Sequence, residues 1–255
     1  MSELVIRQIP VLRDNYVYLL RDEASGATGV VDPSVAEPVL AVLAETGWRL
    51  THILNTHHHP DHTGGNLEIK RATGAIVVGP RADRDRIPGI DVAVADGERY
   101  ALGTEAAEVF DVPGHTRGHI AYWFKDSRAL FCGDTLFLMG CGRLFEGTPE
   151  QMWRSLSKLR RLPGETRVYC GHEYTQANAR FALTVEPQNA ALVARARRVD
   201  ALRAEGQSTV PGTMADELAT NPFLRADQPA LQEAAGAPGD PVATFAAIRR
   251  RKDVF

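Results

Sequence analysis

One short histidine-rich stretch constrains this chain more than any other feature. Residues 55–63 read Asn-Thr-His-His-His-Pro-Asp-His-Thr and hold four of the eight histidines in the 255-residue sequence. Imidazole nitrogens and carboxylate oxygens are the ligands that zinc, iron and manganese prefer. The apolar residues 50–54 predict a buried strand that ends near Asn55, and residues 63–73 predict a helix. We therefore expect the stretch on a turn at a strand end, where open α/β sheets place their sites.

The spacing within this stretch indicates more than one metal ion. His57 and His59 are two residues apart, so they project to the same side of an extended turn. Asp61 and His62 follow a proline, whose ring restricts its own backbone and that of the residue before it. Two groups of ligands can thus diverge from one turn.

Three further residues of ligand type occupy similar positions. His115, Asp134 and His172 each come directly after a glycine and a predicted strand. A single histidine at a strand end is more often structural than a ligand. Together with the histidine-rich stretch, four predicted strands are followed by residues of ligand type. This repetition indicates that the four strand ends share one crevice.

The number of these residues is sufficient for a binuclear site. His57, His59 and His115 form one set, and Asp61, His62 and His172 form a second set. Asp134 is then available to bridge the two ions through its carboxylate. Three protein ligands and a shared carboxylate leave an open position for water on each ion, which is the pattern of catalytic sites.

Composition limits the compartment and the partners. The formal net charge of −3 gives no support to general binding of nucleic acid or membranes. No apolar run approaches the roughly 20 residues of a membrane span. The three cysteines form no CxxC pair and no signal-peptide pattern precedes them, so we expect a cytoplasmic monomer with reduced thiols. Cys132 and Cys170 are interpreted as small core residues.

The chain divides by pattern into two parts. Residues 1–174 alternate short strands and helices, and the first strands, at 4–6, 16–20 and 29–33, are expected to pair antiparallel. Residues 83–96 are interpreted as a loop. Strands are also expected at 120–124 and 167–170, and a helix is expected at 148–162, with Thr148 as N-cap and Gln151 completing a capping box. Residues 175–255 contain no convincing strand, and helices are expected at 190–204, 213–219 and 240–251. We therefore predict an α/β domain followed by a smaller helical domain.

The histidine stretch resembles the T-H-x-H-x-D-H signature of the metallo-β-lactamase superfamily, and His115, Asp134 and His172 match its remaining ligand positions in order. Within that superfamily the chain resembles the glyoxalase II, or hydroxyacylglutathione hydrolase, family. The similarity covers nearly the whole chain, including the helical tail. The supporting stretches are residues 131–137, 140–148, 169–175, 186–187 and 221–225.

The resemblance implies a four-layer αββα sandwich with a C-terminal helical domain that binds glutathione. It implies hydrolysis of S-D-lactoylglutathione, a small-molecule glutathione thioester, to glutathione and D-lactate by a metal-bridging hydroxide. Asp61 and Asp134 are the expected catalytic carboxylates. Two divalent ions are expected per chain, with zinc as the first expectation and iron or manganese as alternatives.

The resemblance also implies a set of substrate contacts in the second half of the chain. Arg143 stands where lysine is common in the family, and Phe145 stands where tyrosine is common, so one hydroxyl hydrogen bond is missing. Tyr174 follows Gly-His-Glu. Arg249 and Lys252 are three apart on one predicted helix and share a face that can receive carboxylates.

Three other functions are compatible with parts of the pattern. An iron-dependent persulfide dioxygenase on the same fold needs one iron with two histidines and an aspartate, which leaves Asp61, His62 and His172 idle. A metal-dependent nuclease needs a basic groove, which the acidic balance of the chain opposes. A non-catalytic, metal-stabilised binding module would lose its fold, but no turnover, on metal removal.

Overall fold

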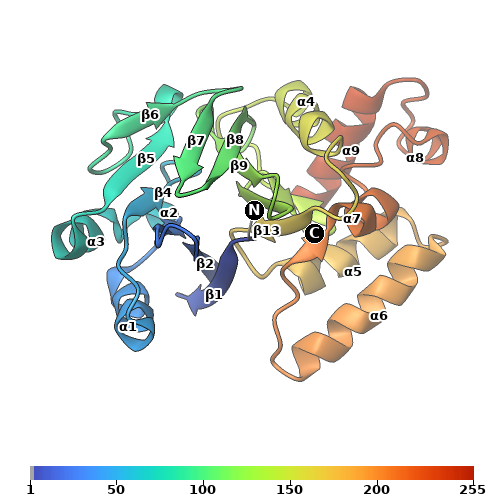
Figure 1. The fold of residues 1–255 in the computed structure, drawn as a ribbon. Coiled ribbons are helices and arrows are strands. Elements are labelled where there is room, and N and C mark those ends of the chain that lie inside the picture. Colours follow the sequence, from blue (N-terminus) through green and yellow to red (C-terminus); the bar gives the residue numbers. More distant parts are fainter. Residues whose placement is uncertain (1–2) are drawn as a thin grey trace. The chain divides into compact units, whose positions relative to one another are not determined.

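The computed structural model describes residues 3–255, whose helices and strands are drawn in Figure 1. It divides into two compact units, each of which contains a cluster of buried apolar side chains. Unit 1 comprises the described residues up to Asp111 together with Arg117–Gly133. Unit 2 comprises Val112–Thr116 together with Asp134–Phe255. This division follows packing, whereas the predicted boundary after residue 174 follows the chain and stays a prediction.

Six strands form the first sheet of unit 1, in the order in which they occur along the chain. The first three strands pair antiparallel, which confirms the prediction, and the later ones pair parallel. Helices that follow β3 and β4 make the parallel connections. The elements are β1 (Val5–Val11), β2 (Asn15–Arg21), β3 (Thr28–Val31), α1 (Ala36–Thr46), β4 (His52–Leu54), α2 (Pro60–Thr63), α3 (Asn66–Thr73), β5 (Ile76–Pro80), a 3-10 turn (Arg81–Asp83) and β6 (Val92–Val94).

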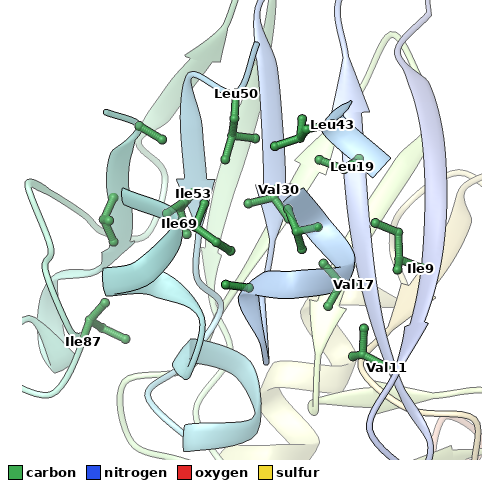
Figure 2. Close-up of a cluster of buried hydrophobic side chains, with 14 residues drawn as sticks. Ile9, Val11, Val17, Leu19, Val30, Leu43, Leu50, Ile53, Ile69 and Ile87 are labelled. Atoms are coloured by element: carbon green, nitrogen blue, oxygen red, sulfur yellow. The ribbon is translucent and has the colours of Figure 1, made fainter. Parts of the chain in front are cut away.

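Apolar side chains of the first sheet pack against α1 and α3 to form the core of unit 1 (Figure 2). Val17, Leu19 and Val30 are fully buried in this cluster. Burying a side chain of this size stabilises the fold by about 1.5–3 kcal/mol. Because β4 lies in the middle of this packed sheet, the turn that follows it starts from a fixed position.

A second set of strands in unit 1 faces the first sheet. It consists of β7 (Arg99–Leu102), β8 (Glu105–Asp111), β9 (Ile120–Phe124) and β10 (Ala129–Gly133), paired antiparallel in chain order. The Tyr18 ring lies 5.4 Å from the Phe131 ring, and the Tyr122 hydroxyl donates to the backbone oxygen of Asn55 at 3.0 Å. Unit 1 therefore contains facing sheets with helices over the first one, as expected for a sandwich of the αββα type.

The sequence does not predict two strands of unit 1. β6 lies within the stretch 83–96, and the expectation of a loop is wrong there because Val92–Val94 pairs with β5 at the sheet edge. β7 pairs with β8, and its residues Arg-Tyr-Ala-Leu alternate between exposed and less exposed positions over only four residues. Both strands are short and are stabilised by pairing with a neighbouring strand. Their own residues therefore give little indication of a strand.

Unit 2 contains short strands and most of the helices. Its elements are β11 (Leu136–Phe137), β12 (Gly140–Cys141), α4 (Pro149–Leu159), β13 (Arg167–Cys170), α5 (Thr175–Val185), α6 (Ala190–Ala204), β14 (Gly212–Thr213), α7 (Met214–Thr220), α8 (Pro229–Ala234) and α9 (Pro241–Asp253). The expectation of no strand after residue 175 is wrong at β14, which pairs antiparallel with β13. None of the helices within residues 3–255 is long and apolar enough to cross a membrane.

Helix ends with side-chain caps are the ones that the sequence predicts well. Thr148 and Gln151 form the expected capping box at α4, and Asp240 caps α9 by accepting from the Ala243 N–H. By contrast, α5 and α8 begin at Tyr174 and Gln228 without a side-chain cap. α8 begins with Pro229, a weak start signal, and α5 has no such residue; neither helix is predicted from the sequence.

Two apolar clusters hold the helical part of unit 2 together. Met139 packs with alanine, leucine and valine side chains of α5 and α6. An aromatic group connects α5, α9 and the segment after α7, with ring centroids of Phe181 and Phe223 at 6.1 Å and of Phe223 and Phe245 at 5.7 Å. Residues 175–255 thus form a packed helical body, as the sequence predicts.

Candidate metal centre

The histidine-rich stretch forms a turn between β4 and α2, where the sequence places it. The predicted helix over residues 63–73 is present as two helices, α2 and α3, separated by Gly64 and Gly65. A Cβ atom on Gly64 would lie 2.5 Å from the Ser34 oxygen, and one on Gly65 would lie 2.9 Å from the Pro33 oxygen. These glycines let the turn pack directly on the segment after β3.

Asp32, at the end of β3, orients the two most buried histidines of the turn. Its Oδ2 lies 3.1 Å from Nδ1 of His62 and accepts the Thr56 hydroxyl at 2.6 Å. The hydroxyl oxygen lies 3.0 Å from Nδ1 of His57 and, having used its own proton, accepts the imidazole N–H. Both imidazoles are therefore held with Nδ1 protonated, which leaves Nε2 as the nitrogen with a lone pair.

Asp32 also lies close enough to His57 and His62 to complete a ligand set. However, both of its oxygens already accept hydrogen bonds, since Oδ1 takes the backbone N–H of Thr56 at 2.7 Å. Its backbone has φ of 48°, a left-handed conformation that aspartate tolerates better than most residues. We interpret Asp32 as the group that holds the histidines in place.

His59 and Asp61 complete the group on this turn. The His59 ring centroid lies 4.8 Å from that of His57. Oδ2 of Asp61 lies 3.6 Å from Nε2 of His62 and accepts from the Asn15 side-chain amide at 3.0 Å. The four predicted ligands of residues 57–62 thus lie together within unit 1.

His58 and His119 support the same turn. Nδ1 of His58 lies 3.0 Å from the buried Asp83 carboxylate, and Arg86 lies 3.1 Å from its Nε2. The His119 ring stacks on His57 with centroids 4.5 Å apart. The sequence gives no signal for the contacts of Asp83 and Arg86, because they join residues that are more than 20 positions apart.

The other three predicted ligands lie together within unit 2. Nε2 of His115 lies 3.4 Å from Oδ2 of Asp134, and Nε2 of His172 lies 3.3 Å from the same oxygen. Nδ1 of His115 donates to the Arg143 backbone oxygen at 2.9 Å, which fixes the tautomer that presents Nε2. All three side chains are buried.

The donor chemistry of both groups fits divalent metal ions. Several imidazoles present Nε2 while Nδ1 is held by an oxygen, which is the arrangement of histidines that ligate metals. Carboxylates lie beside these nitrogens in each unit. The histidine and aspartate clusters therefore indicate a metal site.

The cysteines do not belong to either group. Cys132, Cys141 and Cys170 are buried free thiols, which confirms the interpretation of Cys132 and Cys170 as core residues. Burial raises the pKa of Cys141 to about 11 and that of Cys170 to about 12. The thiolate is the form that binds metals and attacks electrophiles, so these side chains are poorly suited to either role.

Phe145 and Tyr174, two of the predicted substrate contacts, are exposed aromatic residues of unit 2. Phe145 is 63% exposed and its ring lies 5.2 Å from that of His115. Tyr174 is 37% exposed, and its ring stacks on His172 at 4.7 Å with an interplanar angle of 3°. Both rings thus lie beside predicted metal ligands, with a face or edge available to a substrate.

Arg249 and Lys252 on α9 differ in their surroundings. Arg249 is 4% exposed, donates to the Cys141 backbone oxygen at 2.9 Å and pairs with Asp253 at 2.9 Å. Nζ of Lys252 donates to the Ala177 oxygen at 3.3 Å. Burial, together with the positive charges of Arg249 and Arg143, lowers the pKa of Lys252 to about 8. Arg143 itself is exposed.

Comparison with known families assigns both halves of the chain. Residues 11–172 match the metallo-β-lactamase superfamily, and residues 173–255 match the family described as hydroxyacylglutathione hydrolase C-terminus. A hydroxyacylglutathione hydrolase from Methylococcus capsulatus is 66% identical over 99% of this chain and 99% of its own length.

Solved structures agree on the fold. ETHE1 from Myxococcus xanthus has a TM-score of 0.67 and 28% identity, over 98% of this chain and all of its own. A structure described as TTHA1623 in a di-iron-bound form has a TM-score of 0.61 and 25% identity, over 86% of this chain and 99% of its own.

The fold expected from the sequence is thereby confirmed as the metallo-β-lactamase fold with a C-terminal helical domain. The family matches span the histidine stretch, the later histidines and aspartate, and the tail. This chain belongs to the hydroxyacylglutathione hydrolase, or glyoxalase II, family of the metallo-β-lactamase superfamily.

Proposed function

We propose that this protein hydrolyses S-D-lactoylglutathione to glutathione and D-lactate. The observation that carries the proposal is the match of residues 173–255 to the C-terminal part of hydroxyacylglutathione hydrolases, added to a superfamily match over residues 11–172. The superfamily match alone supports a metal-dependent enzyme. The tail match supports the glutathione thioester as the substrate.

In this proposal the seven predicted ligands would hold two divalent ions, and the superfamily match over residues 11–172, which includes all of them, supports it. His57, His59 and His115 would hold one ion, Asp61, His62 and His172 would hold the other, and the Asp134 carboxylate would be shared by both. The approach of two histidine Nε2 atoms to one oxygen of Asp134 supports its bridging role. The similarity to a protein described as di-iron-bound supports two ions, and we expect zinc in them.

Divalent ions at such a centre would supply Lewis acidity and lower the pKa of bound water to about 7. The chain's own contribution is to fix the geometry, because Asp32, Thr56 and the Arg143 carbonyl hold the imidazoles in one tautomer. During hydrolysis a C–O bond forms, the C–S bond breaks and glutathione leaves as a thiolate. A free thiol has a pKa near 8.5, so the thiolate departs without a strong general acid.

Unit 2 supplies the contacts to glutathione in this proposal, through residues 175–255 and the segment after β12. The positive charges of Arg143 and Lys252 receive the carboxylates of the tripeptide, and their electrostatic coupling supports a common location. Phe145 and Tyr174 offer exposed rings for the apolar part of the substrate. Arg249 is buried, so we expect it to act on this region mainly through the Cys141 carbonyl. We expect a monomer in solution.

Hydrolysis of S-D-lactoylglutathione by the purified protein, with metal content measured on the same sample, tests the proposal. We expect release of glutathione thiol that stops on chelation and returns when zinc is added. The Asp134→Ala variant should lose turnover, while Glu165→Ala, an exposed carboxylate of the same unit, should retain it. Oxygen consumption with a persulfide and no thioester hydrolysis would instead identify a dioxygenase.

A further inference from the structure

The hairpin formed by β11 and β12 is held by side chains from the helical tail. Each of the five residues 137–141 has a backbone group bonded to such a side chain. Asn221 donates to the oxygens of Phe137 at 3.1 Å and Gly140 at 2.9 Å. The remaining bonds are Asn178 Nδ2 to Leu138 O at 3.1 Å, Met139 N to Glu217 Oε2 at 2.8 Å, and Arg249 Nη1 to Cys141 O at 2.9 Å.

This attachment lies in the interior of unit 2. All residues of the hairpin are buried, and Met139 at its tip packs into the cluster between α5 and α6. Met139 has φ of 54°, a left-handed conformation that methionine rarely adopts. Glu217 and Asn221 have no exposed surface. The buried Glu217 carboxylate is paired with Arg195 and also accepts from Asn221 at 2.9 Å.

Groups of the candidate site lie at the base of this hairpin. Asp134 comes two residues before β11, and Arg143 comes two residues after β12. The base is closed by the Gly142 N–H, which donates to the Thr135 oxygen at 3.2 Å. From within the hairpin, the Phe137 ring lies 5.2 Å from the exposed Tyr174 ring. The hairpin therefore connects the tail to both Arg143 and Tyr174.

We propose that Asn221, Asn178 and Glu217 are positioning residues for the glutathione part of the substrate. They fix the hairpin, and the hairpin in turn fixes Arg143 and Tyr174. This inference rests on the proposed function, and it adds a second role for the tail besides direct contact with glutathione.

Because the base of the hairpin is closed without help from the tail, we expect the hairpin variants to weaken substrate binding and not metal binding. Asp134 lies outside the hairpin, beside His115 and His172, and the bond between Gly142 and Thr135 closes the loop independently of the tail. Loosening the hairpin therefore moves the substrate contacts and leaves the metal ligands in place. The Michaelis constant should rise, whereas kcat and metal content should change little.

The test uses the full-length protein and the variants Asn221→Ala and Asn178→Ala. The Asn178 amide makes one bond to the hairpin, so its loss is a milder change should Asn221→Ala not fold. Glu186→Gln is the matched control, because it weakens the pair with Arg225 in the same tail without touching the hairpin. Amide hydrogen exchange of residues 136–142, kcat and KM for lactoylglutathione, and metal content are measured for each protein.

We expect faster exchange of residues 136–142 in both hairpin variants. The KM of Asn178→Ala should rise about fivefold, the effect of one lost hydrogen bond, and that of Asn221→Ala, which loses two bonds to the hairpin, should rise further. Glu186→Gln should match the wild type in both measurements. Unchanged exchange, or faster exchange with an unchanged KM, would overturn the proposal, as would loss of metal in step with activity. Hydrogen exchange needs no turnover, and thus it separates failure of this inference from failure of the proposed hydrolysis.

Discussion

At the scale of single residues, the histidines depend on neighbours that fix their tautomers. Asp32 reaches His62 directly and His57 through the Thr56 hydroxyl. The sequence predicts the ligand-type residues themselves, because metal-binding chemistry restricts which residues can serve and the motif spacing brings them to strand ends. It does not predict the partner of His58, because the Asp83 contact exists only once the chain has folded.

Replacing Asp32 with asparagine should weaken metal binding about 10- to 100-fold, as is typical when a group that orients a ligand is changed. Asparagine keeps the size and tolerates the left-handed backbone, but its amide has a single accepting oxygen, whereas Asp32 uses both of its carboxylate oxygens as acceptors. The affinity is measured by competition with a chelator. The control is Asp126→Asn, an exposed carboxylate in unit 1. Unchanged affinity in Asp32→Asn would argue against the orienting role.

Lys252 should make substrate capture sensitive to pH. Its pKa is lowered from 10.5 to about 8, so its positive charge is lost as the pH rises through about 8. We predict that kcat/KM of the wild type falls above this pH relative to that of Lys252→Arg, whose guanidinium stays charged. A constant ratio of the two values from pH 7 to 10 would refute the prediction.

The lowered pKa of Lys252 also determines how the free energy of unfolding changes with pH. Between pH of about 8 and 10.5 the unfolded chain keeps a proton on Lys252 that the folded chain has released. The unfolded state binds more protons in this window, so the contribution of Lys252 to the free energy of unfolding rises with pH there. At pH values below the folded pKa, the buried charge lowers stability.

At the scale of elements, the sequence predicts those that carry strong local signals. β9 and β13 are alternating or continuous runs of apolar residues, and their observed bounds agree with the prediction. α4 and α9 have side-chain caps and begin where predicted. β6, β7, α5 and α8 lack such signals, since pairing or packing with distant residues stabilises them.

The capping box of α4 should make a measurable contribution to stability. Thr148→Ala removes the acceptor of the Gln151 N–H and should lower the free energy of unfolding by about 1 kcal/mol. Thr148→Ser retains the hydroxyl and should therefore keep most of the stability that Thr148→Ala loses. Urea unfolding gives both values, and equal midpoints for the wild type and Thr148→Ala would show that the cap contributes nothing.

At the scale of the whole molecule, the predicted ligands come from distant parts of the chain. Residues 57–62 belong to unit 1, and His115, Asp134 and His172 belong to unit 2. The superfamily match over residues 11–172 includes all seven residues, and it is the support for our proposal of two metal ions. The sequence predicts this combination because each group contains too few ligands for two ions, whereas the seven residues together suffice.

Native mass spectrometry of the wild type and of His172→Ala tests this claim most directly. We predict two divalent ions per chain in the wild type. Removing His172 should release the ion that we propose it holds together with Asp61 and His62, so that one ion remains. Two ions retained in His172→Ala, or fewer than two in the metal-saturated wild type, would contradict the account.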